Sequence, residues 1–327
     1  MKVLVTGATG FLGRAIVEEL LQNEFEVYTT GKSPEANLPN YFQADLTDSE
    51  SLSELEKIGE IDTFIHSAGL AHQFVETSGK DFRKVNVEGT RNVANLASKL
   101  KAERFILISS VAVYGAALVS PRRAEFEEDL QCQPSGFYAE SKLEAEKNAV
   151  EICSNNSIDL TILRPSTIIG ENDRGNVARL IEAVDRRRFL WVGKGKNLKS
   201  LVYKRDVARA CLLFAGNLDR AKNNKTNIYN VTAAPVSMRE IVEEIEKALE
   251  KRVLPVRIPA STLQKSLNLI GKASGIKRLG KIAGTLDKWL SDDVFSGEKI
   301  RTELGFQIAV SPREGIRREV LHYRKQK

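Results

Sequence analysis

The sequence of 327 residues is short of cysteine and histidine, with three of each. Cys132, Cys153 and Cys211 form no CxxC pair and are odd in number, so we expect neither a disulfide framework nor a metal site. No hydrophobic run reaches the roughly 18–20 residues that a membrane helix needs. The amino terminus has only a short apolar stretch before a glycine-rich turn, which predicts no secretory signal. We therefore expect a cytoplasmic protein.

Hydrophobic residues make up 42% and charged residues 28% of the chain, which excludes collagen-like, low-complexity and disordered classes. The net charge of +6 is unevenly distributed. Residues 1–164 carry 16 Lys and Arg against 25 Asp and Glu, whereas residues 165–327 carry 33 against 18. The second half should attract anions such as a nucleotide diphosphate, a nucleic acid or an anionic membrane surface. Composition alone does not choose among them.

Short apolar runs alternate with segments of helical periodicity through the first half of the chain, which predicts βαβ units and a parallel, doubly wound α/β sheet. Two domains fit the length, with residues 1–165 as the first and residues 166–327 mainly as the second, while strands near 199–231 return to the first sheet. The expected strands are 2–6, 25–30, 40–44, 62–66, 104–109, 159–163, 199–203 and 227–231. The expected helices are 11–21, 49–58, 80–100, 136–153, 176–187, 206–215 and 238–249.

A glycine-rich loop follows the first expected strand and opens the first helix. Its glycines are Gly7, Gly10 and Gly13, in the spacing GxxGxxG. Such glycines allow a tight turn, a close approach of the backbone to a pyrophosphate, and close packing of helix on strand. An ordinary glycine-rich turn is the alternative, but the order strand, loop, helix favours dinucleotide binding. The other loop residues expected to contact the cofactor are Thr9, Phe11 and Leu12.

The end of the second strand bears on the choice of dinucleotide. It contains no acidic residue to bind the ribose 2′-hydroxyl of NAD, and Lys32 is placed to meet a 2′-phosphate. Both NAD and NADP fit, and Lys32 favours NADP slightly, although a solvated loop lysine would look the same. Asp45 and Leu46 are placed to reach the adenine, and Asp45 would equally serve as a helix cap.

Tyr138 and Lys142 form a YxxxK motif on an expected helix, where the spacing places both side chains on one face. A phenol has a pKa near ~10, so a neighbouring ammonium is needed to make it an acid–base catalyst at neutral pH. Ser110 follows a strand at the edge of the sheet where ligands bind, and it would hold a substrate oxygen beside Tyr138. A strand-ending turn is the plainer interpretation of Ser110.

Together these motifs resemble the extended short-chain dehydrogenase/reductases, and among them the nucleotide-sugar 4-epimerases and 4-keto reductases. The matching segments are TGATGFLG, IHSAGLAH, VNVEGT, SSVAVYG, YAESK and LRPSTIIG, and they span most of the chain. The resemblance implies a Rossmann domain with a smaller carboxyl-terminal substrate domain. It implies Tyr138 as acid–base, Lys142 on the cofactor ribose and Ser110 on the reacting oxygen. The further cofactor residues implied are Ala68, Gly69, Asn86 and Pro165, and the further substrate residues are Asn176 and Lys199.

Two departures from the family pattern affect the expected reaction. The hydroxyl segment reads Ser-Val-Ala, where the resemblance leads one to expect Thr-Asp-Glu in a 4,6-dehydratase, so dehydration is disfavoured. Lys199 stands where many relatives carry an arginine on the diphosphate, which gives a point charge without a bidentate fork. Epimerisation and reduction of a 4-keto sugar remain equal expectations.

The stretch 260–284 carries five basic residues and no acid between apolar ones. It fits a lid over an anionic substrate, a helix on a membrane surface, or a solvated basic face. A second hypothesis is therefore an NADP-dependent reductase or dehydrogenase of a lipid, sterol or small carbonyl compound, and a third is a non-catalytic dinucleotide-sensing scaffold. No nucleic-acid motif accompanies the charge, so no nucleic-acid partner is expected. The resemblance implies a homodimer formed through helices 80–100 and 136–153.

Overall fold

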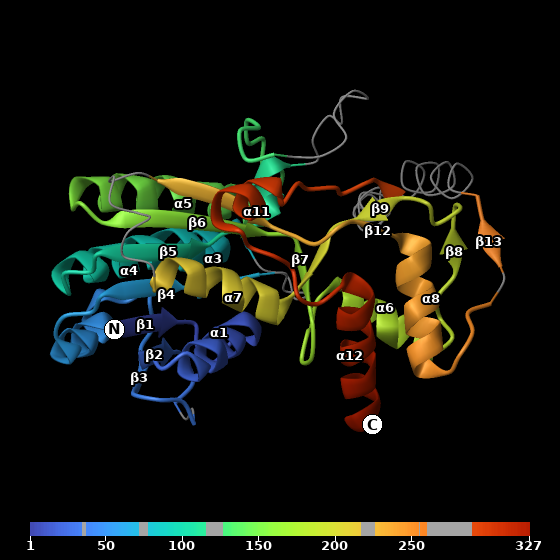
Figure 1. The fold of residues 1–327 in the computed structure, drawn as a ribbon, viewed down its shortest axis with the longest axis horizontal. Helices are drawn as coiled ribbons and strands as arrows, with labels where there is room; N and C mark the ends of the chain where they lie inside the picture. Colours follow the sequence, from blue (N-terminus) through green and yellow to red (C-terminus); the bar gives the residue numbers. More distant parts are fainter. Residues whose placement is uncertain (35–36, 72–77, 116–126, 217–225, 255, 260–289) are drawn as a thin grey trace. The chain divides into compact units, whose positions relative to one another are not determined.

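The computed structural model describes the chain except for residues 35–36, 72–77, 116–126, 217–225, 255 and 260–289. A seven-stranded parallel sheet has the order β11-β6-β5-β4-β1-β2-β3, which confirms the expected doubly wound α/β fold. Figure 1 shows helices on both sides of this sheet. Its strands are β1 (Lys2–Thr6), β2 (Glu26–Gly31), β3 (Tyr41–Gln43), β4 (Thr63–His66), β5 (Arg104–Ile108), β6 (Asp159–Pro165) and β11 (Asn227–Val231).

The central strands are buried on both faces, which is why they read as continuous apolar runs. In β1, Val3 and Val5 point into one hydrophobic core, and Leu4 points into the other. The first core includes residues of α1 (Phe11–Gln22), α7 (Lys204–Ala215) and α11 (Glu298–Leu304). The second includes residues of α2 (Ser49–Ser53), η1 (Glu54–Ile58), α4 (Gly89–Lys99) and α5 (Phe137–Asn155).

The helix expected over 80–100 is broken into three pieces. It consists of α3 (Gly79–Phe82), the π-helical η2 (Arg83–Glu88) and α4. Ser78 and Asp81 form a capping box at its start, which fixes the first turn. The π-helical turn carries Asn86 toward the interior, where its side chain is buried. Such turns are common at functional sites, and helical periodicity in the sequence does not distinguish them from an α-helix.

The chain divides into two compact units. Unit 1 comprises residues 1–168, 202–232 and 295–309, and unit 2 comprises residues 169–201, 233–294 and 310–327. The expected strand 199–203 is two short strands that pair in different two-stranded sheets, so of the strands expected near 199–231 only β11 joins the seven-stranded sheet. The remaining elements are η3 (Val111–Tyr114), β7 (Thr167–Ile169), β8 (Trp191–Val192), β9 (Leu198–Lys199), β10 (Leu201–Tyr203), β12 (Val236–Ser237) and β13 (Arg257–Ile258).

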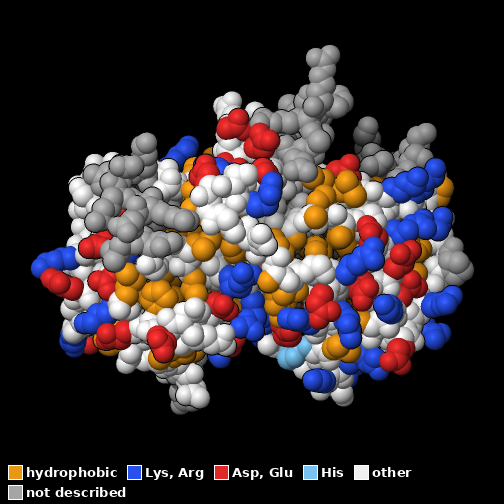
Figure 2. Space-filling model, in the orientation of Figure 1, with side chains coloured by type: hydrophobic (Ala, Val, Ile, Leu, Met, Phe, Trp, Pro, Cys, Tyr) orange, Lys and Arg blue, Asp and Glu red, His pale blue; other side chains and the backbone are white. Residues whose placement is uncertain are grey.

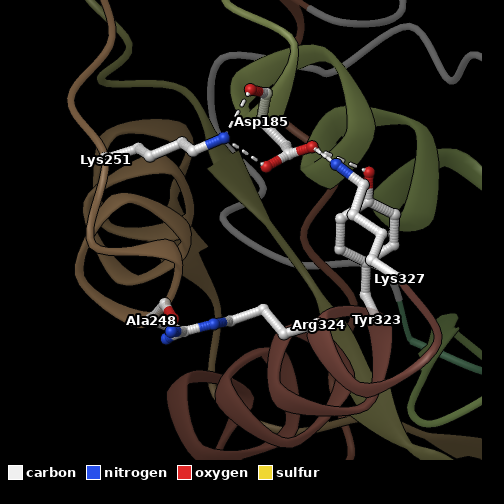
Figure 3. A network of polar contacts seen from close by, with 6 residues as sticks. All are labelled: Asp185, Ala248, Lys251, Tyr323, Arg324 and Lys327. Atoms are coloured by element: carbon white, nitrogen blue, oxygen red, sulfur yellow. Dashed lines mark hydrogen bonds and ion pairs between the residues drawn. The ribbon is translucent and has the colours of Figure 1, made fainter.

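Among the described residues of unit 2, the core is packed between α6 (Asn176–Asp185), α8 (Met238–Leu249) and α12 (Pro312–Lys325). Buried Asp185 links all three segments, as Figure 3 shows. Its carboxylate accepts hydrogen bonds from Lys251, 2.7 Å away, from Tyr323 at 3.0 Å, and from Lys327. The Lys251 ammonium, followed by that of Lys327, holds the pKa of Asp185 well below its usual range. The last residue of the chain is thereby attached to the end of α6.

Within the described residues, no helix combines the length and the apolar character that crossing a bilayer would require.

Candidate active site

The switch point of the sheet lies between β1 and β4, where the strand order reverses and where such folds bind ligands. The glycine loop occupies this point. Gly7 has a positive φ of 69°, and a Cβ there would lie 2.6 Å from the backbone of Ala68. A Cβ on Gly13 would lie 2.1 Å from the carbonyl oxygen of Gly7. Both positions therefore require glycine.

Helix α1 begins in a way that suits a phosphate. Its amino-terminal cap is Gly10, which supplies no capping side chain, and its first turn contains no acidic residue. The unpaired N–H groups and the helix dipole can therefore act on an anion. Arg14 donates a hydrogen bond to the carbonyl of Thr9 at 3.2 Å and stiffens the loop. The residues at this point fit the pyrophosphate of a dinucleotide. Leu12 is buried in the core, and Phe11 lies beneath the ammonium of Lys204, 5.4 Å from its ring centre.

The structure changes the interpretation of Lys32. Its ammonium lies 2.9 Å from the carboxylate of Asp45, so its charge is already compensated. Asp45 also accepts hydrogen bonds from the backbone and hydroxyl of Thr47. The hydrogen bond from Lys32 lowers the pKa of Asp45 to about 2. Lys32 is therefore not the free cation that the argument for a 2′-phosphate assumed. Leu46 packs partly against the second core instead of lying free.

Three predicted residues converge where β4 ends. They are Gly69, Asn86 and Lys142: a Cβ on Gly69 would lie 3.1 Å from the Lys142 ammonium and 3.2 Å from the Asn86 amide oxygen. The Asn86 side chain binds both backbone groups of Leu70, at 2.7 and 3.1 Å, and donates to Ser141 at 2.9 Å. A Cβ at position 69 would require Lys142 or Asn86 to shift, so glycine keeps this cradle open for a polar cofactor ring and its ribose.

His66 is buried between two threonine hydroxyls beneath this region. Its Nδ1 lies 2.6 Å from the hydroxyl of Thr6, and its Nε2 lies 2.9 Å from that of Thr90. Burial, together with the nearby Lys142 ammonium, lowers the pKa of His66 to about 3. The imidazole is therefore neutral at physiological pH, and it joins β1, β4 and α4 without adding a charge.

Ser110, Tyr138 and Lys142 are brought together by β5 and α5. Ser110 caps η3 by accepting from the N–H of Ala112 at 3.1 Å, and it hydrogen bonds to Tyr138. Burial raises the pKa of Tyr138, while the bond to Ser110 lowers it. The Lys142 ammonium donates to the carbonyl of Ile108 at 2.9 Å, and burial lowers its pKa to about 8.

A buried ion pair supports this site, and sequence analysis did not find it. Arg164 binds both carboxylate oxygens of Glu146, at 3.0 and 2.6 Å, and both side chains are at most 5% exposed. Glu146 also accepts from Ser109 at 2.5 Å, and Arg164 donates to the hydroxyl of Tyr114 at 3.1 Å. Glu146 lies one turn after Lys142 on the same helix, and this spacing is the feature of the sequence that could have placed Glu146 near the site. Pro165, the next residue after Arg164, ends β6 beside Val231 of β11.

The two remaining predicted substrate residues belong to unit 2. Asn176 is exposed at the first position of α6. Lys199 is largely buried, and its ammonium lies 2.5 Å from the carboxylate of Asp293. Its positive charge is therefore compensated within unit 2. The predicted basic stretch 260–284 lies outside the described residues.

Comparison with known proteins agrees with this geometry. The chain is 30% identical over 79% of its length, and 75% of the relative's, to an Escherichia coli O157:H7 4-epimerase of N-acetyl-α-D-glucosaminyl-diphospho-ditrans,octacis-undecaprenol. It is 26% identical over 97% of its length, and 98% of the relative's, to a 2-alkyl-3-oxoalkanoate reductase of Stenotrophomonas maltophilia. The structure of Thermus thermophilus UDP-glucose 4-epimerase in complex with NAD superposes with a TM-score of 0.76, at 24% identity over 99% of both chains. The model of the NAD dependent epimerase/dehydratase family matches residues 3–232, and the chain belongs to this family of enzymes.

Proposed function

We propose that the protein is an NAD-dependent 4-epimerase of a sugar carried on a diphosphate. Two observations carry the proposal: Ser110 is hydrogen-bonded to Tyr138, and Lys142, one turn after Tyr138 on α5, holds its buried ammonium at the carbonyl of Ile108, beside the glycine cradle. The 30% identical relative is a 4-epimerase of a diphosphate-linked sugar, which favours epimerisation over net reduction. The substrate class then includes nucleotide-sugars and sugars on a polyprenyl diphosphate.

The glycine loop would hold a nicotinamide dinucleotide, whose chemistry would be the acceptance of a hydride from the sugar carbon and its return to the opposite face of that carbon. Tyr138 would remove the proton from the hydroxyl oxygen on the same carbon and later return it to that oxygen. Ser110 donates a hydrogen bond to the reacting oxygen and holds it against the phenol. Lys142, with its pKa lowered to about 8, is still mainly protonated at neutral pH and would bind the cofactor ribose, while the hydrogen bond with Ser110 opposes the burial that raises the pKa of Tyr138.

Two features of the chain favour this reaction over its alternatives. The positions after Ser110 are Val111 and Ala112, which carry no acid or base for the elimination of water. The Lys32–Asp45 ion pair leaves no uncompensated ammonium at Lys32 beyond the end of β2, which supports NAD. The family model names NAD, and the related Thermus structure contains NAD, so the comparisons give no support to the preference for NADP.

The first test is to denature freshly purified protein and identify the nucleotide that is released. Stoichiometric NAD is the result expected of an epimerase, because its cofactor is regenerated in each turnover. The protein is then incubated with UDP-N-acetylglucosamine, UDP-glucose and an undecaprenyl-diphosphate sugar, and products are separated by configuration. Tyr138→Phe should lower kcat by about 10²–10⁴ while NAD stays bound. An active Tyr138→Phe variant would refute the assignment of Tyr138.

A reductase of a lipid or small carbonyl compound is the second candidate. The full-length match to the oxoalkanoate reductase favours it. The ion pair of Lys199 with Asp293 also favours it, because the charge of Lys199 is then already compensated and is not free for the diphosphate of a sugar substrate. Net oxidation of added NADH or NADPH by a keto substrate, without epimerised sugar, would select this alternative.

A further inference from the structure

One surface of unit 2 combines exposed apolar and basic side chains around strands β8 and β13. We define this β8–β13 surface by five residues, Arg188, Leu190, Arg252, Leu254 and Val256. Leu190 is 43% exposed, Leu254 46% and Val256 51%, which is unusual for large apolar side chains. Arg188 and Arg252 are also exposed. Figure 2 shows Lys and Arg side chains gathered along the edge where Figure 1 places β8 and β13.

The pairing of the two strands brings these residues together. Trp191 is in register with Arg257 in the parallel β8–β13 pair, so Leu190 lies beside Val256. The N–H of Trp191 donates to the carbonyl of Val256 at 3.3 Å, which holds this register. Residues 252, 254 and 256 are spaced by two, as are residues 188 and 190. The apolar and basic side chains of this surface therefore come from two segments separated by more than sixty positions in sequence.

The positive charge of this surface is not compensated by neighbouring acids. Within the described residues, Arg188 and Arg252 take part in no ion pair. The acids close to them in sequence are engaged elsewhere: Glu182 pairs with Arg186, Asp185 with Lys251 and Lys327, and Glu250 with Arg324. A soluble surface normally intersperses both signs of charge and avoids contiguous exposed apolar groups. This surface therefore fits a partner that is itself negatively charged at its boundary and apolar beneath it.

An anionic lipid bilayer has this combination of properties. Its charged headgroups attract arginine, and shallow insertion buries leucine and valine. Trp191 packs edge-on against Phe189, with ring centres 5.1 Å apart, and both partly buried rings also pack against the core of unit 2, which anchors the strand segment that carries Leu190.

We propose that the β8–β13 surface docks the enzyme reversibly on an anionic membrane. The attachment is peripheral, through headgroup contacts of Arg188 and Arg252 and shallow burial of Leu190, Leu254 and Val256. This inference concerns a surface within unit 2 and does not depend on the identity of the sugar. Its failure would leave the proposed epimerase activity untouched, because Ser110, Tyr138 and Lys142 all belong to unit 1.

The test is co-sedimentation of the full-length protein with vesicles. One set contains phosphatidylcholine alone, and the other contains equal parts of phosphatidylcholine and phosphatidylglycerol. Each basic residue near an anionic surface strengthens partition about fivefold. We therefore expect binding to the anionic vesicles, weakening with added salt, and at least about 25-fold weaker binding of Arg188→Glu/Arg252→Glu. Absence of binding, or equal binding to both vesicle sets, would overturn the proposal.

An apolar pair of variants separates insertion from simple charge attraction. Leu254→Ser should weaken binding to anionic vesicles roughly tenfold. Leu21→Ser is the matched control, because Leu21 is 47% exposed but lies in unit 1, and its binding should equal that of the wild type. Equal binding by both variants would contradict the proposal. If Leu254→Ser instead changes the mass of the protein in solution without vesicles, the surface serves self-association and the proposal fails.

Discussion

Replacing Glu146 with glutamine removes one charge from the buried pair beneath the site. Glu146 and Arg164 have side chains only 5% and 4% exposed, so water cannot compensate the guanidinium that remains. Removing one partner of such a pair costs about 3–5 kcal/mol of stability. At roughly 2–4 °C for each kcal/mol, the unfolding temperature of unit 1 should fall by roughly 6–20 °C.

Glu144→Gln is the matched control for this change. It lies two positions away on the same helix, and its carboxylate pairs with Arg83 at 2.7 Å on the surface. Because both side chains are more than a third exposed, the loss should stay below about 1 kcal/mol. The double variant Glu146→Met/Arg164→Leu removes both charges and should recover part of the loss.

Thermal unfolding is best followed by far-ultraviolet circular dichroism. The residue ranges of unit 1 contain no tryptophan, so tryptophan fluorescence would not report this unit. Equal unfolding temperatures for Glu146→Gln and Glu144→Gln would refute the reasoning, because burial of the pair would then have no energetic effect.

Three further predictions follow from the described contacts. Gly13→Ala should lower NAD affinity and stability, because its Cβ would lie 2.1 Å from the Gly7 carbonyl oxygen. Gly89→Ala is the control and should lower neither, because the nearest atom to its Cβ is 3.7 Å away. Equal NAD affinities of the two variants in calorimetric titration would contradict this. His66 has a folded pKa of about 3, below its unfolded value, so its contribution to stability falls as the pH falls below 6.5. Between pH 7 and 5, the free energy of unfolding of the wild type should therefore fall by about 2 kcal/mol more than that of His66→Asn. Urea unfolding measures both, and equal decreases would contradict this. Asp185→Asn should destabilise unit 2 by about 2 kcal/mol at pH 7, as reported by tryptophan fluorescence, because it weakens bonds from Lys251, Tyr323 and Lys327. The carboxyl pKa is lowered on folding, so this gap should close below about pH 4, and a gap independent of pH would exclude the charge as its cause.

Local patterns determined much of the fold. The order of strands and helices in unit 1 could be predicted because strands buried on both faces are apolar throughout and helices show their own period. The glycines at positions 7 and 13 could be predicted because the positive φ of Gly7 and the contact of Gly13 with the Gly7 carbonyl arise within the loop itself, whereas the contact of Gly7 with Ala68 depends on the packing of β1 beside β4. The helical spacing of Tyr138 and Lys142 was likewise a local property of α5.

Contacts between distant segments were decided only by the tertiary structure. The sequence presented Lys32 as a free cation, but the pairing of β2 with β3 brings Asp45 to it and removes the argument for a 2′-phosphate. Lys199 was similarly compensated by Asp293, ninety-four positions away. The Glu146–Arg164 pair and the β8–β13 surface each join segments that share no local pattern. A charge in a sequence has no fixed partner, and only the packed chain determines whether it is neutralised, buried or left exposed.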